Sequence, residues 1–244
     1  MKKILGIVTS ILMVMMLAAC GSNKNELVMA TNAEFPPYEY HEGDAIVGID
    51  VEICKAIAEE MGKTLVIEDM QFDSVITSVQ TGKADLGAAG LTVTEDRLKN
   101  INFSESYATA AQVIIVPTGS DIASPDDLEG KRIGVQLGTT GDIYAEDIAD
   151  ATIERYNKGF EAVQALLQGK IDAVIIDNEP AKVYVEQNPD TLIIVDEAFT
   201  YEEYAIAISK ENTQLLDDVN AAIKKLKESG KLDEIVNKYI SADN

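Results

Sequence analysis

An arginine stands in an unusual place, near the start of a predicted helix. In the stretch GLTVTEDR, Thr94 is a good N-cap and the acidic residues Glu95 and Asp96 suit the first helical turn. Arg97 then falls at the third helical position, where the helix dipole makes a cation unfavourable by roughly a few tenths of a kcal/mol. A guanidinium group matches a carboxylate, so a bound anion would explain this placement. A surface ion pair with Glu95 is the alternative.

A second candidate anion site lies in the stretch QLGTTGD, where a predicted strand ends at Gln136 and a helix follows. Free N–H groups at the helix start and the hydroxyls of Thr139 and Thr140 suit a carboxylate as well as a phosphate. The stretch has no lysine of the kind found in nucleotide-binding P-loops, so nucleotide binding is not supported. Ordinary capping of the helix by Thr139 or Thr140 is the alternative.

A carboxylate completes the set of candidate binding groups. Asp177 ends the apolar run AVIID and precedes a predicted helix. Ligands of open α/β sheets bind beyond the carboxyl ends of the strands, where a carboxylate can accept a hydrogen bond from an ammonium group. Helix capping by Asp177 is the alternative.

Apolar runs alternate with stretches of helical period, which predicts a largely parallel sheet covered by helices. The fold class is therefore α/β. The predicted strands are Leu27–Thr31, Thr64–Glu68, Ala84–Ala89, Gln112–Pro117, Lys131–Gln136, Thr152–Tyr156, Ala173–Asp177, Leu192–Asp196 and Ala205–Ser209.

Several helix ends can be read from local chemistry. Asp50 is predicted to cap a helix that ends at Gly62, and two amphipathic helices are predicted to close the chain, one before and one after Gly230. The pattern Gly-Lys-x-Asp occurs within residues 80–86 (QTGKADL) and again within residues 167–173 (LQGKIDA). Each copy reads as a helix end followed by a strand, so two related lobes are predicted, with chance reuse of good capping chemistry as the alternative.

The first twenty residues have the character of an export signal. Two lysines precede a short apolar run that ends in Leu17-Ala18-Ala19-Cys20. This block looks like a bacterial lipoprotein cleavage box, which implies lipidation of Cys20 and a chain held at the extracellular face of the cell membrane. An ordinary signal peptide cut nearby is the alternative. Residues 21–25 are predicted to be a polar tether.

The net charge and the cysteine content argue against several functions and structural features. The net charge of −22 disfavours binding to nucleic acid or to anionic lipid. Cys54 is the only cysteine besides Cys20, so no intramolecular disulfide framework is expected, and Cys54 is predicted to be a small core residue. No metal or cofactor is expected.

From Glu26 to Ile240 the chain resembles the bacterial polar amino acid binding proteins of ABC importers. The resemblance is carried by TNAEFPPYEY at residues 31–40, VGID at 47–50, and the block GLTVTEDR at 90–97 followed by NFSESY at 102–107. It implies a two-lobed fold of the periplasmic-binding-protein-like II type, with two hinge crossovers. Lobe 1 would comprise residues 26–117 and 200–244, and lobe 2 residues 118–199.

The same resemblance implies a role for each candidate residue. Arg97 would bind the α-carboxylate of an amino acid, helped by Thr92 and by the backbone at Thr139 and Thr140. Asp177 and the Gly90 carbonyl would accept the α-ammonium group. Phe35 and Phe72 would flank the ligand side chain, with core packing as the alternative for Phe72. The full set of expected ligand-binding residues is Asn32, Glu34, Phe35, Phe72, Gly90, Leu91, Thr92, Arg97, Gln136, Thr139, Thr140 and Asp177.

The ligand side chain stays open at this point. Many relatives have an aspartate where this chain has Asn32, and Glu34 and Gln136 would lie nearby, so lysine, arginine, glutamine, histidine and cystine are all admitted. The expected partners are a free polar amino acid and the permease and ATPase of an ABC importer, with the chain itself a monomer.

Two other functions fit the same fold. One is an enzyme similar to cyclohexadienyl dehydratases, for which Glu34 or Glu179 would have to supply a general acid, because the lone histidine, His41, is expected to be exposed. The other is a sensor that presents ligand to a separate receptor, since no membrane helix or kinase-like extension follows Asn244. Neither is the main expectation.

Overall fold

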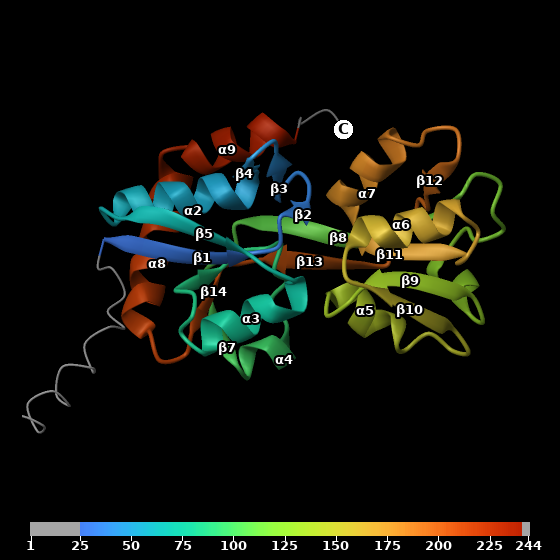
Figure 1. Cartoon of the computed structure of the whole chain (residues 1–244), viewed down its shortest axis with the longest axis horizontal. Helices are drawn as coiled ribbons and strands as arrows, with labels where there is room; N and C mark the ends of the chain where they lie inside the picture. The colour runs from blue at the N-terminus through green and yellow to red at the C-terminus, as the bar shows by residue number, and fades with distance from the viewer. Residues whose placement is uncertain (1–24, 241–244) are drawn as a thin grey trace, which may run out of the picture.

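The computed structural model describes residues 25–240, which form two α/β lobes lying side by side (Figure 1). The predicted signal peptide, the lipidated Cys20 and all but the last residue of the predicted tether lie outside the described residues. Among residues 25–240, none of the helices has the length and apolar character needed to cross a bilayer.

Lobe 1 is built on a five-stranded sheet in the order β5-β1-β6-β14-β7. Strand β1 runs parallel to β5 and β6, whereas β14 is antiparallel to β6 and β7. Helices α2 and α9 lie on one face of this sheet and α3 on the other (Figure 1). The strands are β1 Glu26–Thr31, β5 Thr64–Asp69, β6 Leu86–Gly87, β7 Ile101–Phe103 and β14 Ala207–Ser209. The helices are α2 Ile49–Glu60, α3 Phe72–Gln80, α4 Glu95–Leu98, α8 Thr213–Glu228 and α9 Lys231–Tyr239.

Lobe 2 is built on a six-stranded sheet in the order β10-β9-β11-β8-β12, with β13 also paired to β8. Strand β9 is parallel to β10 and β11, and β8 is antiparallel to its neighbours β11, β12 and β13. The strands are β8 Ala108–Pro117, β9 Arg132–Gln136, β10 Thr152–Tyr156, β11 Ala173–Asp177, β12 Leu192–Ile194 and β13 Thr200–Tyr204. The helices are α5 Thr140–Ala145, α6 Gly159–Leu167 and α7 Asn178–Glu186, with a 3₁₀ turn at Pro125–Leu128.

Strands β8 and β13 join the lobes as an antiparallel pair. At the lobe 1 end of this pair, Thr92 forms an isolated bridge with Tyr204. By hydrogen bonding, β8 and β13 belong to the sheet of lobe 2. The predicted lobe limits assign both strands to lobe 1. The limits at residues 117/118 and 199/200 remain a proposal, and the structure shows that the chain crosses between the sheets at 103–108 and 204–207.

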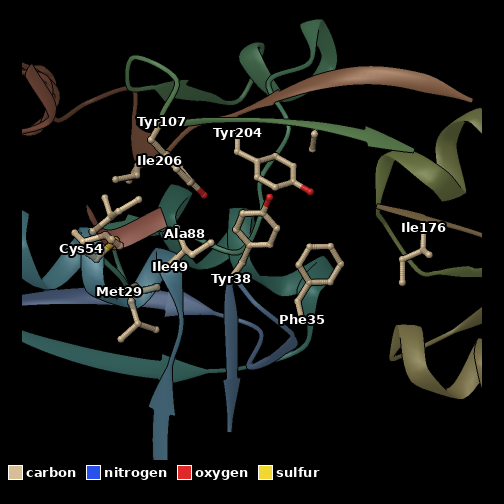
Figure 2. Packing of buried hydrophobic residues seen from close by; sticks show 14 of the residues in the cluster. Met29, Phe35, Tyr38, Ile49, Cys54, Ala88, Tyr107, Ile176, Tyr204 and Ile206 are labelled. Atoms are coloured by element: carbon tan, nitrogen blue, oxygen red, sulfur yellow. The ribbon is translucent and has the colours of Figure 1, made fainter. Parts of the chain in front are cut away.

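A small third sheet lies where the lobes meet. Its strands are β2 Glu34–Phe35, β3 Glu39–Glu42 and β4 Ala45–Val47, in the order β2-β3-β4. It brings aromatic rings to the interface: the Tyr38 ring lies edge-on to that of Tyr204, with centroids 5.0 Å apart, and Phe35 stacks beside Tyr38 at 6.0 Å (Figure 2). These rings continue a buried cluster that extends through both lobes.

All nine predicted strands contain observed strand residues, and the two closing helices are confirmed as α8 and α9. The repeated helix-end pattern is also confirmed, because Gly82 follows α3 in lobe 1 and Gly169 follows α6 in lobe 2, both at φ +69°. Cys54 is fully buried, as predicted.

The prediction for Asp50 is wrong. The helix α2 begins at Ile49 with Gly48 at its N-cap, so Asp50 lies inside the first turn and is 1% exposed. Its carboxylate accepts hydrogen bonds from the Gly90 N–H at 2.9 Å and from the Tyr107 hydroxyl at 2.7 Å. Asp50 therefore ties together three distant segments of lobe 1 instead of capping its own helix.

Candidate functional site

A small cavity lies between the two lobes. Its walls come from both lobes and include the ends of β1, β9 and β11 and the starts of α3 and α5. The lining residues are Asn32, Phe35, Phe72, Ala89, Gly90, Thr92, Arg97, Gln136, Thr139, Thr140 and Asp177. Ten of the twelve residues expected at the site therefore meet around one space; Ala89 was not predicted.

Arg97 occupies the predicted position at the start of α4. Thr94 is the N-cap, and its hydroxyl accepts a hydrogen bond from the Arg97 N–H. The guanidinium group donates to the Thr92 carbonyl at 2.8 Å and, across the cleft, to the Gly138 carbonyl at 3.1 Å. It also lies 5.6 Å from the centre of the Phe72 ring. Arg97 is 7% exposed, so its cation faces the cavity and not bulk water.

Burial lowers the pKa of Arg97, while the nearby carboxylates of Glu202 and Asp177 act in the opposite direction. A guanidinium group stays protonated in proteins despite such a shift. Arg97 therefore supplies a fixed positive charge to the cavity.

The start of α5 faces Arg97 from lobe 2. Thr139 is the N-cap, and its hydroxyl accepts from the Asp142 N–H at 3.3 Å. Thr140 follows and is almost fully buried. Capping by Thr139 is thus confirmed, and it leaves the anion-binding role of this turn as a proposal.

Asp177 takes the N-cap position of α7, but its side chain does not cap the helix. It accepts a hydrogen bond from the Tyr204 hydroxyl instead. Burial raises the pKa of Asp177 to about 7, with a further contribution from the Glu202 carboxylate, while hydrogen bonds from Tyr204 and Gln112 act to lower it. A buried carboxylate with this pKa gains strongly from a ligand cation placed beside it.

Gly90 has a left-handed backbone at φ +54°. A Cβ atom at this position would lie 2.9 Å from Cε1 of Phe35, so the residue must be small for the Phe35 ring to take its place in the wall. The Asp50 carboxylate holds the Gly90 N–H and so fixes the orientation of the turn.

Glu202 was not predicted at this site. It lies on the connecting strand β13, is 7% exposed, and accepts hydrogen bonds from the Thr92 hydroxyl at 2.7 Å and from Gln112 Nε2 at 3.2 Å. The proton of the Thr92 hydroxyl is therefore directed at Glu202, and a ligand carboxylate would have to compete for it. The sequence alone does not distinguish Glu202 from Glu203: the two glutamates are adjacent, but only Glu202 is buried.

The other end of the cavity carries amides and rings. Gln136 Nε2 donates across the cleft to Asn32 Oδ1 at 2.9 Å and also to the Asn157 carbonyl at 3.2 Å. Asn32 Nδ2 donates to the Met70 carbonyl at 2.8 Å. The rings of Phe35 and Phe72 complete the wall. Phe72 also packs against the lobe 1 core, so core packing is confirmed and its contact with a ligand side chain stays a prediction.

Two expected residues do not line the cavity. Leu91 is fully buried in the lobe 1 core, whereas its neighbours Gly90 and Thr92 line the cavity. Glu34 lies just outside the lining, where it pairs with Lys158 of lobe 2. Contact of Leu91 or Glu34 with a ligand therefore stays a prediction.

The two carboxylates considered for a general acid, Glu34 and Glu179, both form ion pairs. Glu34 pairs with Lys158, and Glu179 pairs with Lys182. His41 lies 3.1 Å from the Asp69 carboxylate and is exposed outside the cavity. Residues 25–240 hold no cluster of three or more histidine, cysteine, aspartate or glutamate side chains suited to a metal ion.

Comparison with family models gives one match that spans nearly all the described residues. The model for bacterial extracellular solute-binding proteins, family 3, matches residues 27–242.

Individual relatives agree with this match. The arginine-binding extracellular protein ArtP of Bacillus subtilis is 34% identical over the full length of both chains. A solved ancestral arginine-binding protein bound to arginine is 38% identical with a TM-score of 0.86, and the match covers 89% of this chain and 99% of that one. A structure of an ancestral arginine-binding protein bound to glutamine is also 38% identical, with a TM-score of 0.85 over 90% and 99% of the two chains. These relatives are described as binding proteins.

Proposed function

Because the chain belongs to the bacterial extracellular solute-binding proteins, family 3, we propose that it captures a free polar amino acid in the interlobe cavity and delivers it to an ABC importer. ArtP and the ancestral proteins are described as binding arginine or glutamine, which supports an amino acid as the ligand.

The pairing of opposite charges in one closed space carries this proposal. Arg97 and Asp177 are 7% and 5% exposed, and both line the cavity. A free amino acid carries a carboxylate and an ammonium group on one carbon, so it can satisfy both buried charges at once. Arg97 would hold the carboxylate, with the backbone of Thr139 and Thr140 opposite, and Asp177 with the Gly90 carbonyl would hold the ammonium group.

Closure of the lobes is the proposed signal to the importer. The site needs side chains from both lobes, and β8 and β13 provide the two connections about which the lobes can rotate. A ligand that contacts both lobes favours the closed arrangement, which a permease can then recognise. The same proposal places the chain at the extracellular face of the membrane through a lipid on Cys20.

Thermal unfolding of residues 21–244 with each proteinogenic amino acid and with cystine tests this function. A ligand at one hundred times its dissociation constant should stabilise the fold by about 2.7 kcal/mol. We expect one or a few polar amino acids to raise the unfolding temperature. No response to any amino acid would contradict the proposed function.

A further inference from the structure

The charges that line the cavity are already balanced. Among the lining residues only Arg97 and Asp177 carry charged side chains. These two match the carboxylate and ammonium groups that every free amino acid carries. The lining around the ligand side chain, formed by Asn32, Gln136, Phe35 and Phe72, therefore supplies no formal charge of its own.

The amides at this end leave a specific hydrogen-bonding pattern. Both Nε2 hydrogens of Gln136 are used, on Asn32 Oδ1 and on the Asn157 carbonyl. Asn32 Nδ2 uses one hydrogen on the Met70 carbonyl. Within residues 25–240 this leaves Gln136 Oε1 and the second lone pair of Asn32 Oδ1 as acceptors, and one Nδ2 hydrogen of Asn32 as a donor. A carboxamide offers both a donor and an acceptor, whereas a guanidinium or ammonium group offers donors only.

One carboxylate outside the lining, that of Glu34, already forms an ion pair. Glu34 follows Asn32 by two residues, and Lys158 follows Asn157, so the ion pair Glu34–Lys158 crosses the cleft directly beside the Asn32–Gln136 hydrogen bond. The Tyr184 hydroxyl donates to the Glu34 carbonyl at 3.4 Å and helps to hold this segment. A cationic ligand side chain would therefore find the Glu34 carboxylate occupied and the Lys158 ammonium group behind it.

Other carboxylates near Lys158 are also engaged. Asp69 accepts from the Ala33 N–H at 2.9 Å and pairs with His41, and Glu161 accepts from the Lys158 N–H at 3.2 Å. The Phe72 ring could attract a cation, but the Arg97 guanidinium already lies 5.6 Å from its centre. A cationic side chain would thus lie between the Arg97 and Lys158 cations, while the nearby carboxylates of Glu34, Asp69 and Glu161 already have partners of their own.

We infer that the cavity selects an amino acid with an uncharged hydrogen-bonding side chain, of the carboxamide class, over a cationic amino acid, and that Lys158 is the specificity-determining residue. This inference rests on the proposed function. Lys158 acts in two ways: its ammonium group repels a ligand cation, and its ion pair with Glu34 withholds a carboxylate that would otherwise accept such a cation.

Calorimetric titration of glutamine, asparagine, arginine and lysine tests this inference. We expect the unaltered chain to bind the better carboxamide ligand at least about tenfold more tightly than arginine. Lys158→Met should reduce this preference at least about tenfold, chiefly by tightening arginine binding. Lys182→Met is the matched control, because Lys182 pairs with Glu179 within α7, and it should leave the preference unchanged.

Each outcome decides a separate question. Tighter binding of arginine than of glutamine by the unaltered chain would overturn the inference and keep the proposed function. A preference that Lys158→Met leaves unchanged would overturn the role of Lys158. Lys158→Gln provides a second neutral variant if the methionine variant does not fold. Absence of binding by every amino acid would overturn the proposed function and the inference with it.

Discussion

The Thr92 hydroxyl donates a hydrogen bond to Glu202 Oε2 over 2.7 Å and so links lobe 1 to the connecting strand β13. The same oxygen accepts from Gln112 Nε2 at 3.2 Å, and that nitrogen lies 3.2 Å from the Thr140 hydroxyl of lobe 2. One buried chain of hydrogen bonds therefore runs behind the cavity from Thr92 to Thr140. It also brings the Glu202 carboxylate near Asp177, whose pKa it raises.

The first prediction concerns this second carboxylate. Replacing Glu202 by glutamine removes a negative charge that raises the pKa of Asp177, so Asp177 should ionise at lower pH. We expect the pH at which ligand affinity reaches half its maximum to move downward, as measured by calorimetry from pH 5 to pH 9. Glu203→Gln is the control, since Glu203 is exposed on the same strand. Equal profiles for the two variants would exclude an electrostatic role for Glu202.

The second prediction is the pH dependence of the unaltered chain. The ligand ammonium favours ionised Asp177, so below a pKa of about 7 binding must first release the Asp177 proton. For an uncharged side chain such as that of glutamine, affinity should be about tenfold weaker at pH 6 than at pH 8. Asp177→Asn should bind more weakly, by roughly 10- to 100-fold, and lose this dependence. A variant that keeps the slope would show that another group titrates.

The third prediction tests the turn at Gly90. Gly90→Ala adds a Cβ at φ +54° and 2.9 Å from the Phe35 ring, so we expect a loss of about 1–3 kcal/mol in unfolding free energy and weaker ligand binding. Gly43→Ala is the matched control, because Gly43 has φ +63° but no atom within 4 Å of the added Cβ. Chemical denaturation and calorimetry of both variants measure the two effects. Equal losses of affinity would contradict a wall built by Gly90 and Phe35.

The fourth prediction concerns Asp50. Asp50→Ala leaves the buried Gly90 N–H and Tyr107 hydroxyl without their acceptor, each at a cost of about 1–3 kcal/mol. We expect unfolding in urea to show a loss of about 2–5 kcal/mol in stability. Asp44→Ala, in the exposed turn between β3 and β4, should change stability by less than about 0.5 kcal/mol. A small effect at position 50 would show that water replaces the carboxylate.

Local chemistry explains which parts of the fold were predictable. Thr94 and Thr139 lie directly before their helices, and the two glycines Gly82 and Gly169 follow theirs, so nearest neighbours in the chain determine these ends. The apolar runs likewise predict strands from neighbouring residues alone. The Asp50 prediction failed because its partners, Gly90 and Tyr107, lie far away in the sequence.

The remaining features depend on contacts between segments. Strand β13 has the sequence TYEEY, which contains too few apolar residues to predict a buried strand, so Glu202 stayed unrecognised. The short strands β2, β3 and β4 of the third sheet are defined by pairing with one another. The ion pair Glu34–Lys158 joins residues 124 positions apart, and no local pattern indicates it.

The role of Arg97 is the central claim, and the affinity of Arg97→Ala for the amino acid that best stabilises the unaltered chain tests it most directly. Arg132→Ala serves as the matched control, because Arg132 pairs with Asp172 on the surface of lobe 2. Removing one partner of a buried charge pair costs about 2–5 kcal/mol, so we expect Arg97→Ala to weaken binding at least about 30-fold while it remains folded. Equal affinities of the two variants, measured by calorimetry, would contradict the proposed site.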